Sequence, residues 1–336
     1  MKEGAKALAG IVLAILLLWW VLRDTDPQQL RRAIAGASLG MLILGGVLNL
    51  GHNVFRVWRW RALLAPVREG LPFRPLFAAV VVGYLTTWLV PGRLGELVRP
   101  ALLSARENVP LGPCLGTVLS DRLLDGMTIV LLFAAGTLVT RLPGDAAPHV
   151  AAIRASALLL TGVMAGALAV LVAAASARER LSAWLARRSG SIRWIGRSVL
   201  SVSQGTEAMR SPALLVRIVA LSVASWLTIA LGTWIGIAAA GVSVPFGAVL
   251  ILLPLLALGV ALPTPGGAGG YHAAMVFGLT KIFEVPRDLA VAAGILMHLA
   301  VTVPVIVLGL LLLRTERIAW GDLIAAARQV RALGAS

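Results

Sequence analysis

Six long apolar runs leave this chain few folds to choose from. The runs lie at 7–22, 34–54, 111–140, 151–175, 214–240 and 289–313. A helix needs about 20 apolar residues to cross the hydrocarbon core of a bilayer, and within that core only helices and closed barrels satisfy every backbone polar group. Hydrophobic residues make up 59% of the chain and charged residues 13%, whereas soluble domains average about 25% charged residues. The sequence therefore predicts an all-α polytopic helical membrane protein, with residues 1–336 forming a single integral membrane domain.

A short segment at 89–99 breaks a further apolar region and introduces charge into it. Pro91 and Gly92 end a helix there, because proline lacks the N–H that a helix needs and glycine disfavours helix interiors. The charged residues that follow within two helical turns are Arg93, Glu96 and Arg99. Broken backbone and charged side chains at membrane depth are tolerated where they are buried in protein or line a cavity, and such charges are usually functional.

A second segment, 262–272, repeats the interruption with the residues Leu-Pro-Thr-Pro-Gly-Gly-Ala-Gly-Gly-Tyr-His. The helices that flank the two breaks are too short to span a bilayer. We therefore expect two re-entrant helical hairpins, 75–105 and 246–283, beside about six full spans. Short segments interrupted by glycine and proline in corresponding halves indicate a transporter with inverted repeats, so the sequence predicts a pseudo-inverted repeat.

The distribution of Lys and Arg predicts the orientation of the chain. The segments 55–74, 176–210 and 314–336 are rich in these residues, and cytoplasmic loops carry such an excess. The loops 141–150 and 241–245 contain few of them and should face outward. The first hairpin would then enter and leave from the inside and the second from the outside, with both termini cytoplasmic. The residues that oppose this trend are Arg23, Arg31 and Arg32, which would lie on the outer side.

The three basic segments are expected at the membrane surface. Residues 55–61, Phe-Arg-Val-Trp-Arg-Trp-Arg, favour an anchor at the lipid headgroups over substrate contact. Segment 176–210 carries seven arginines together with Trp184 and Trp194, which is typical of an amphipathic cytoplasmic linker lying against the membrane. Residues 314–336 form a basic, partly amphipathic tail.

Each break places the start of a helix inside the predicted membrane region. The helices after Gly92 and Gly270 offer unpaired N–H groups and about half a positive charge, and such ends bind anions. Arg93 adds a planar, permanently charged group suited to phosphate. Gly266 and Gly267 would let a ligand approach the backbone closely. Together these features predict a mid-membrane site for an anionic group, most simply a lipid phosphate.

Carboxylates supply the opposite charge. Asp121 and Asp125 lie four residues apart and therefore share a helix face. Three functional roles are open to these two residues and Glu96: they hold arginines in place, relay a proton or receive a cationic headgroup. The structural alternative is an internal salt-bridge lattice that only supports the broken helix. His272, directly after the glycine run, is a further candidate, and His298 a weaker one. The predicted substrate-binding set is Arg93, Glu96, Arg99, Asp121, Arg122, Asp125, Gly266, Gly267, Gly270, Tyr271 and His272.

Other functional classes find no support in the sequence. The net charge of +15 comes from arginines clustered at the ends of apolar runs, which suits anionic lipid headgroups rather than nucleic acid. The single cysteine, Cys114, excludes a disulfide within the chain and a cysteine metal site. The H-E-x-x-H, G-x-S-x-G and Walker motifs are missing from the sequence, so we expect no catalytic residue, metal or cofactor.

Several ordered motifs carry a family resemblance. They are Trp60-Arg61-x-Leu63-Leu64, Pro91-Gly92-Arg93-x-Gly95-Glu96-x-x-Arg99, Asp121-Arg122-Leu123-Leu124-Asp125-Gly126 and Pro265-Gly266-Gly267-x-Gly269-Gly270-Tyr271. Over nearly the whole chain they resemble the lysylphosphatidylglycerol synthase transmembrane, or flippase-like, family. The resemblance implies a protein of a bacterial-type inner membrane that moves a lipid between leaflets. The family commonly has Glu where Asp121 and His272 stand, and the synthase domain of some relatives is absent, so aminoacylation is not expected.

The sequence thus leads to one main functional hypothesis and two alternatives. The main one is a flippase or lipid-linked precursor transporter that moves an anionic or zwitterionic headgroup across the inner membrane. The first alternative is an intramembrane lipid-modifying transferase with Asp121 or Asp125 as base. The second is a non-transporting partner that anchors a membrane glycosyltransferase through segment 176–210. The expected partners are a membrane phospholipid or lipid-linked substrate and a membrane enzyme, with no nucleic acid.

Overall fold

The computed structural model describes residues 2–89, 95–141, 147–186, 196, 200–323 and 325. Within these ranges every regular element is a helix, which confirms the all-α prediction. The elements in chain order are α1 (Lys2–Leu22), α2 (Pro27–Ala35), α3 (Leu39–Leu64), α4 (Phe73–Leu89), α5 (Gly95–Glu107), α6 (Leu111–Val139), α7 (Ala147–Ser176), α8 (Arg178–Ala186), η2 (Gln204–Arg210), α10 (Pro212–Ala239), α11 (Phe246–Ala261), η3 (Pro265–Gly267), α12 (Gly270–Phe283) and α13 (Arg287–Thr315).

Four of these helices, α6, α7, α10 and α13, are long and apolar enough to cross a membrane. The count becomes five if α1 and α2, which are bent by 92° at a short break, form one span. The sixth expected span corresponds to α3, which is 26 residues long. Its polar residues Asn49, His52 and Asn53 lie on a largely enclosed part of the helix, and they lower its average apolar character. The chain is therefore a multi-pass membrane protein with shorter apolar helices between its spans.

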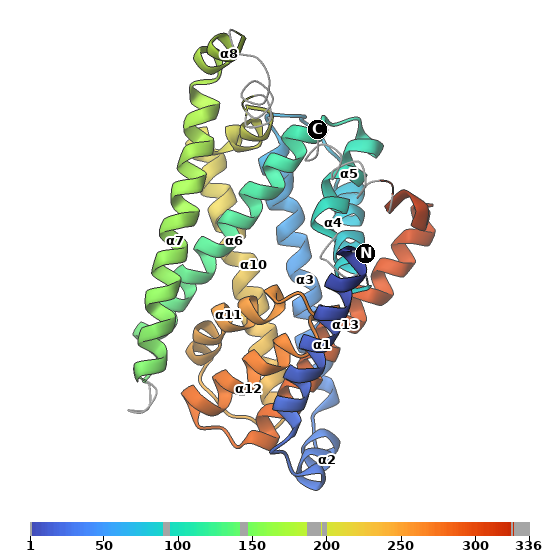
Figure 1. Cartoon of the computed structure of the whole chain (residues 1–336), viewed down its shortest axis with the longest axis vertical. Helices are drawn as coiled ribbons and strands as arrows, with labels where there is room; N and C mark the ends of the chain where they lie inside the picture. The colour runs from blue at the N-terminus through green and yellow to red at the C-terminus, as the bar shows by residue number, and fades with distance from the viewer. Residues whose placement is uncertain are drawn as a thin grey trace.

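Each predicted hairpin is present as a pair of packed helices, and the two pairs lie in different halves of the molecule. Helices α4 and α5 pack against each other, as do α11 and α12. Figure 1 shows the α4–α5 pair in the upper half of the view and the α11–α12 pair in the lower half. The elements between the two arms of the second hairpin are a loop and the short turn η3, in which Gly266 and Gly267 adopt positive φ angles of 58° and 64°. Glycine reaches this region without the steric penalty of a side chain.

A reciprocal contact between two glycines closes each hairpin. A Cβ added at Gly95, the first residue of α5, would collide with the carbonyl oxygen of Gly83 on α4, and a Cβ at Gly83 would lie 3.0 Å from the Gly95 oxygen. In the second hairpin, a Cβ at Gly270, the first residue of α12, would collide with the carbonyl oxygen of Gly259 on α11, and the reverse also holds. Each hairpin therefore closes through a close contact between two glycines, while the inverted repeat stays a prediction.

The broken ends of the two hairpins meet. Trp88, in the last turn of α4, lies against the turn η3, since a Cβ added at Gly267 would be 3.2 Å from the Trp88 ring. Helix α1 covers the same turn, because Gly10 packs directly on the carbonyl oxygen of Pro263. The residues of the first break itself, 90–94, lie outside the described residues. The described residues nevertheless place the end of α4 and the second break side by side.

The remaining helices hold the hairpins in place. Helix α3 packs closely on α10 through Gly45 and Gly232, whose backbones approach so nearly that neither position has room for a Cβ. Small residues at such interfaces allow close helix packing in membranes. Each hairpin also has its own apolar core: one cluster joins α3, α4, α5 and α6, and another joins α10, α11, α12 and α13.

One part of the predicted surface linker lies inside the protein instead. The turn η2, Gln204–Arg210, packs against α6, α3 and α7. Gly205 fits so closely on the backbone of Gly116 and Thr117 that a side chain there would collide with it, and Thr206 is fully buried. Arginine content predicted a surface position for the whole 176–210 segment, but here small residues allow the turn to dock on α6.

Candidate functional site

A cluster of buried ion pairs lies where α3, α5 and α6 meet. Its members, hereafter the charge lattice, are Arg56, Arg59, Glu96, Arg99, Asp121, Arg122 and Asp125. Arg56 and Arg59 are three residues apart on α3, and Asp121 and Asp125 are four apart on α6, so each pair projects from one helix face. The two faces point at each other across the α3–α6 contact.

Asp121 is completely buried and binds arginines from two helices. One carboxylate oxygen accepts a hydrogen bond of 2.7 Å from Arg59 Nε, and the other accepts one of 2.8 Å from Arg99 Nη1. Arg56 Nη1 lies 3.8 Å from the second oxygen. A buried carboxylate with this many cationic neighbours remains ionised and is committed to the pairing.

Asp125, one turn further along α6, has four donors. Arg56 Nη2 donates at 2.6 Å, Arg59 Nη2 at 2.7 Å, Arg122 Nη1 at 3.2 Å and Trp226 Nε1 at 3.0 Å. Trp226 belongs to α10, so this carboxylate also joins the second half of the chain to the charge lattice. Asp125 is therefore the carboxylate through which α3, α6 and α10 are joined.

Glu96 and Arg122 form the more open edge of the charge lattice. Arg122 Nε donates to Glu96 Oε2 at 2.8 Å, and Arg122 Nη2 lies 2.6 Å from Glu96 Oε1, so the pair is bidentate. About a third of each side chain remains exposed, 36% for Glu96 and 35% for Arg122. Because this pair faces open space, it is the part of the charge lattice that a ligand can reach most directly.

Four guanidinium groups in the charge lattice face three carboxylates, which leaves one positive charge in excess. Among the described residues, Arg56 Nε and Nη1 and Arg99 Nε and Nη2 have no hydrogen-bond partner. The Arg99 guanidinium stacks on the ring of Trp60 at 3.9 Å, and that of Arg56 lies 5.5 Å from the ring of Tyr84. Unpaired buried donors are costly, so this positive excess favours an additional anion.

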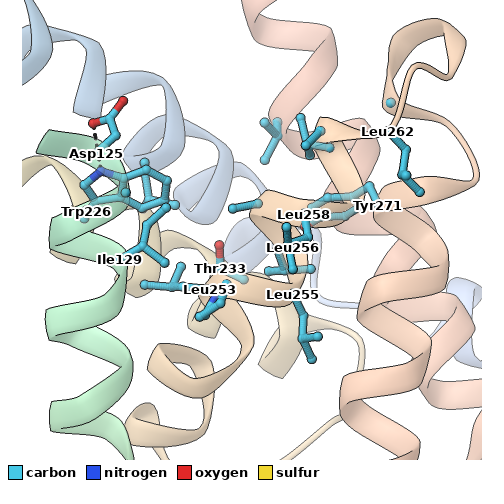
Figure 2. Close-up of a pocket in the computed structure, with 18 of the residues that line it drawn as sticks. Asp125, Ile129, Trp226, Thr233, Leu253, Leu255, Leu256, Leu258, Leu262 and Tyr271 are labelled. Carbon is cyan, nitrogen blue, oxygen red and sulfur yellow. Dashed lines mark hydrogen bonds between the residues drawn. The ribbon is translucent and has the colours of Figure 1, made fainter. Parts of the chain in front are cut away.

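The charge lattice borders a cavity of about 730 Å³. Arg56, Glu96, Arg122 and Asp125 form its charged end. Figure 2 shows Asp125 and Trp226 on one side of this space, with Leu262 and Tyr271 on the other. Between them lies an apolar wall that includes Leu253, Leu255, Leu256 and Leu258 of α11. A hollow that combines a charged end with a wall of leucines suits an amphiphilic ligand.

The far end of the cavity is built around the second break. Gly267, Tyr271 and His298 line it together with Trp88 of the first hairpin. The His298 ring lies 5.6 Å from the Trp88 ring and 5.5 Å from the Tyr271 ring, measured between centroids. Both hairpins therefore contribute to one continuous space. Among the described residues, no group of three or more His, Cys, Asp or Glu side chains is placed to hold a metal ion.

The structure divides the predicted site residues into four groups. Those that line the cavity are Glu96, Arg122, Asp125, Gly267 and Tyr271. Arg99 and Asp121 lie behind the cavity wall in the charge lattice. Those outside the lining are Gly266, Gly270 and His272, although the His272 ring lies 4.7 Å from that of His298. Arg93, the predicted phosphate ligand, lies outside the described residues.

Two arginines at the centre of the charge lattice were predicted to lie at the membrane surface. Segment 55–61 was interpreted as an anchor at the lipid headgroups, but Arg56 and Arg59 are 2% and 0% exposed. Only the opposite face of α3, with Trp58 and Arg61, is exposed. The spacing was the available signal: Asn49, Asn53, Arg56 and Arg59 recur every three or four residues, which marks one polar face of a helix directed into the protein.

Comparison with known proteins agrees with this architecture. "Glycosyltransferase AglD" of Haloferax volcanii is 25% identical over 323 residues, which cover 86% of this chain and 51% of that protein, so the chain spans about half the length of this curated relative. The family model of the lysylphosphatidylglycerol synthase TM region matches residues 7–309 of this chain. Both findings support a function connected with membrane lipids. The chain belongs to the lysylphosphatidylglycerol synthase TM region family.

Proposed function

We propose that this protein is a lipid flippase, which moves a phosphate-bearing headgroup between the two leaflets of a bacterial-type inner membrane. The observation that carries the proposal is the cavity, because one end borders the charge lattice with its positive excess, one wall is apolar, and both hairpins contribute to its lining. A lipid headgroup crossing a bilayer needs a polar environment inside it, since unpaired polar groups in hydrocarbon are costly.

Arg56 is the residue we assign to the phosphate. It lines the cavity, it has unpaired N–H donors among the described residues, and its partner Asp125 already has three other donors. A guanidinium binds phosphate oxygens through two parallel hydrogen bonds, whereas an ammonium acts as a point charge. Arg93 stays a second candidate for the same phosphate because it lies two residues before Gly95, the first residue of α5, in the sequence.

The apolar wall explains how the rest of the lipid is accommodated. Leu253, Leu256 and Leu258 present hydrocarbon to the same cavity that Arg56 enters. The start of an acyl chain can lie along these leucines at no desolvation penalty, since both surfaces are apolar. The headgroup then occupies the charged end while the remainder of each chain stays in the bilayer.

Leaflet exchange in proteoliposomes tests the proposal. Purified protein should accelerate the transfer of a fluorescent phosphatidylglycerol between leaflets, and Arg56→Lys should weaken lipid affinity about 10- to 100-fold, because a charge-assisted hydrogen bond contributes about 1.5–3 kcal/mol. Arg74→Lys is the matched control, since Arg74 is exposed and pairs with Glu316 outside the cavity lining. A wild-type protein that leaves the leaflet exchange of phosphatidylglycerol, phosphatidylinositol and hexosyl phosphoryl polyprenol at the rate of empty liposomes would refute the flippase function.

A second candidate function rests on the relative named as a glycosyltransferase, which is about twice as long as the matched region. In this case the chain would be a non-transporting membrane partner of a glycosyltransferase. Absence of leaflet exchange, together with stable co-purification of such an enzyme, would favour it. The contacts of Asp121 and Asp125 do not favour the transferase hypothesis, because both carboxylates are paired with arginines.

A further inference from the structure

The end of the cavity opposite the charge lattice has a chemistry of its own. Its lining residues, hereafter the ring subsite, are Trp88, Thr264, Tyr271, His298 and Thr302. They combine three aromatic or imidazole rings with two threonine hydroxyls. Thr302 follows His298 by one turn of α13, and Thr264 lies in the same turn as Gly267, whose N–H donates to the Thr264 carbonyl at 3.1 Å. Elements from both hairpins and from α13 therefore surround this space.

Two hydroxyl groups of the ring subsite are unsatisfied. Thr264 Oγ1 and Thr302 Oγ1 are buried atoms without a hydrogen-bond partner among the described residues, and Thr264 as a whole is 8% exposed. Most other threonine hydroxyls in the helices bond a backbone carbonyl one turn away, as Thr86 does to Val82. A buried hydroxyl left unpaired is unfavourable, and a hydroxyl can donate one hydrogen bond and accept two. A ligand rich in hydroxyl groups would satisfy both threonines.

Charge distinguishes the ring subsite from the rest of the cavity. The described lining residues that carry a formal charge are Arg56, Glu96, Arg122 and Asp125, all members of the charge lattice. Both carboxylates among them are already paired with arginine, Glu96 through two contacts to Arg122. An ammonium group at the ring subsite would meet hydroxyls and rings but no free carboxylate among these residues, and burying an unpaired charge is strongly unfavourable.

Helix α4 contributes a residue to each end of the cavity. Tyr84 lies beside Arg56, and Trp88 lies beside His298. Tyr84 and Trp88 are four residues apart on one helix, so they lie on the same face about one helical pitch, roughly 5 Å, apart. A group esterified to a phosphate at Arg56 can therefore extend along this face of α4 toward the ring subsite. Flat aromatic faces such as those of Trp88 and Tyr271 pack well against the C–H face of a saturated ring.

We propose that the transported lipid is a phosphodiester that carries a neutral, polyhydroxylated ring. The inference rests on the proposed flippase function, which it narrows to one class of headgroup. The phosphate binds at Arg56, the ring stacks on Trp88 and Tyr271, and its hydroxyls pair with Thr264 and Thr302. Two sources carry this chemistry: a hexosyl phosphoryl polyprenol, in which the ring is a sugar, and phosphatidylinositol, in which it is a cyclitol.

Binding to purified protein, measured by native mass spectrometry, tests the headgroup with matched lipids. Phosphatidylinositol is compared with phosphatidylglycerol on identical acyl chains, and hexosyl phosphoryl polyprenol with the polyprenyl phosphate that lacks the sugar. We expect the ring-bearing member of at least one pair to bind about tenfold tighter or more, because each satisfied hydroxyl contributes several-fold in affinity. The pair that shows the preference identifies the source of the ring. Lysylphosphatidylglycerol should bind no tighter than phosphatidylglycerol.

Variants locate the preference within the cavity. Thr302→Val keeps the shape of the side chain and removes its hydroxyl, so it should reduce affinity for the preferred ring lipid about fivefold and affinity for phosphatidylglycerol by less. Arg56→Lys should weaken every phosphate lipid together. Equal affinity within both matched pairs would overturn the inference, as would tightest binding of lysylphosphatidylglycerol or of a pyrophosphate-linked lipid.

The two proposals fail in different ways. Leaflet exchange of phosphatidylglycerol without any ring preference would keep the flippase function and refute the headgroup assignment. A ring preference in binding without leaflet exchange of any of these lipids would keep the headgroup assignment and refute transport.

Discussion

The two hairpins share a backbone arrangement and differ in nearly everything else. In the first, α5 begins at Gly95 against Gly83 and then sends Glu96 and Arg99 into buried ion pairs. In the second, α12 begins at Gly270 against Gly259 and continues with a tyrosine and a histidine, and its surroundings are an apolar core. The comparison shows that the hairpin geometry depends on the glycines, while the chemistry of each cavity end depends on the residues that follow them.

The two ends of the cavity therefore differ in their chemistry. Charge is concentrated on α3, α5 and α6, where a positive excess suits a phosphate. Hydroxyls and rings are concentrated at η3, α12 and α13, where a neutral group fits. The two hairpins thus close in the same way and present different chemistry to the cavity.

The strongest test of this comparison is whether the two hairpins enter the membrane from opposite sides. Ala105 on α5 and Lys281 on α12 are both exposed, and the native Cys114 is buried. Ala105→Cys should react with a membrane-impermeant maleimide only in inside-out vesicles, and Lys281→Cys only in intact cells. Labelling of both cysteines from the same side would remove the inverted arrangement on which the transport proposal depends.

Loss of one carboxylate should affect the first hairpin strongly. Asp121→Asn leaves Arg99 buried without its charged partner and removes one of the two carboxylates that Arg59 binds, and breaking a buried pair in this way costs about 3–5 kcal/mol. We expect a large fall in the thermal unfolding temperature in detergent. Glu96→Gln is the control, since Glu96 is partly exposed and its loss should cost about 1 kcal/mol or less. Similar stability for the two variants would show that the charge lattice does not hold the hairpin.

The glycine contacts should respond alike in both hairpins. Gly95→Ala and Gly270→Ala each push a methyl group into a facing carbonyl oxygen, and overpacking of this kind costs about 1–3 kcal/mol. Gly166→Ala on α7, where no other atom lies within 4 Å, is the control and should be neutral or slightly stabilising. Chemical unfolding of the three variants measures the effect. A loss confined to Gly95→Ala would mean that the hairpins are not equivalent scaffolds.

The smallest expected effect concerns the link between the charge lattice and the second half of the chain. Arg59 Nη1 donates to Ser222 Oγ on α10 at 2.8 Å, so Ser222→Ala should cost about 1 kcal/mol in unfolding free energy. Ser225, three residues further on, is also buried, but its hydroxyl has no hydrogen-bond partner among the described residues. Ser225→Ala should therefore be neutral. Equal losses for the two serines would show that the bond to Arg59 contributes nothing specific.

The sequence predicted the scaffold better than the site. Apolar runs and the two Pro–Gly interruptions follow directly from bilayer thickness and backbone geometry, so the helices and both hairpins were recoverable. The charge lattice was only half recovered, because Asp121 and Asp125 were recognised while Arg56 and Arg59 were interpreted as interface residues. The sequence pattern around an arginine near a helix end is the same whether that arginine faces lipid headgroups or an internal carboxylate. The partner, 62 or more residues away in the chain, decides between them.

The ring subsite could not be derived from sequence at all. Trp88, Thr264 and Thr302 are ordinary residues of apolar helices or loops, and nothing in their spacing marks them. They become a group only when the end of α4 meets η3 and α13 lies alongside. Such contacts between distant segments have no local signal, which is why His298 was ranked below His272 although His298 is the one that lines the cavity.

The reciprocal glycine contact also bears on which substitutions each hairpin tolerates. Gly83 with Gly95 and Gly259 with Gly270 touch through main-chain atoms, so each contact survives an exchange of neighbouring side chains that spares the glycines. One hairpin can therefore carry ionic residues and the other neutral ones without a change in the way either closes. The closure consequently depends on the spacing of a few glycines, twelve residues apart in one hairpin and eleven in the other, rather than on shared side chains.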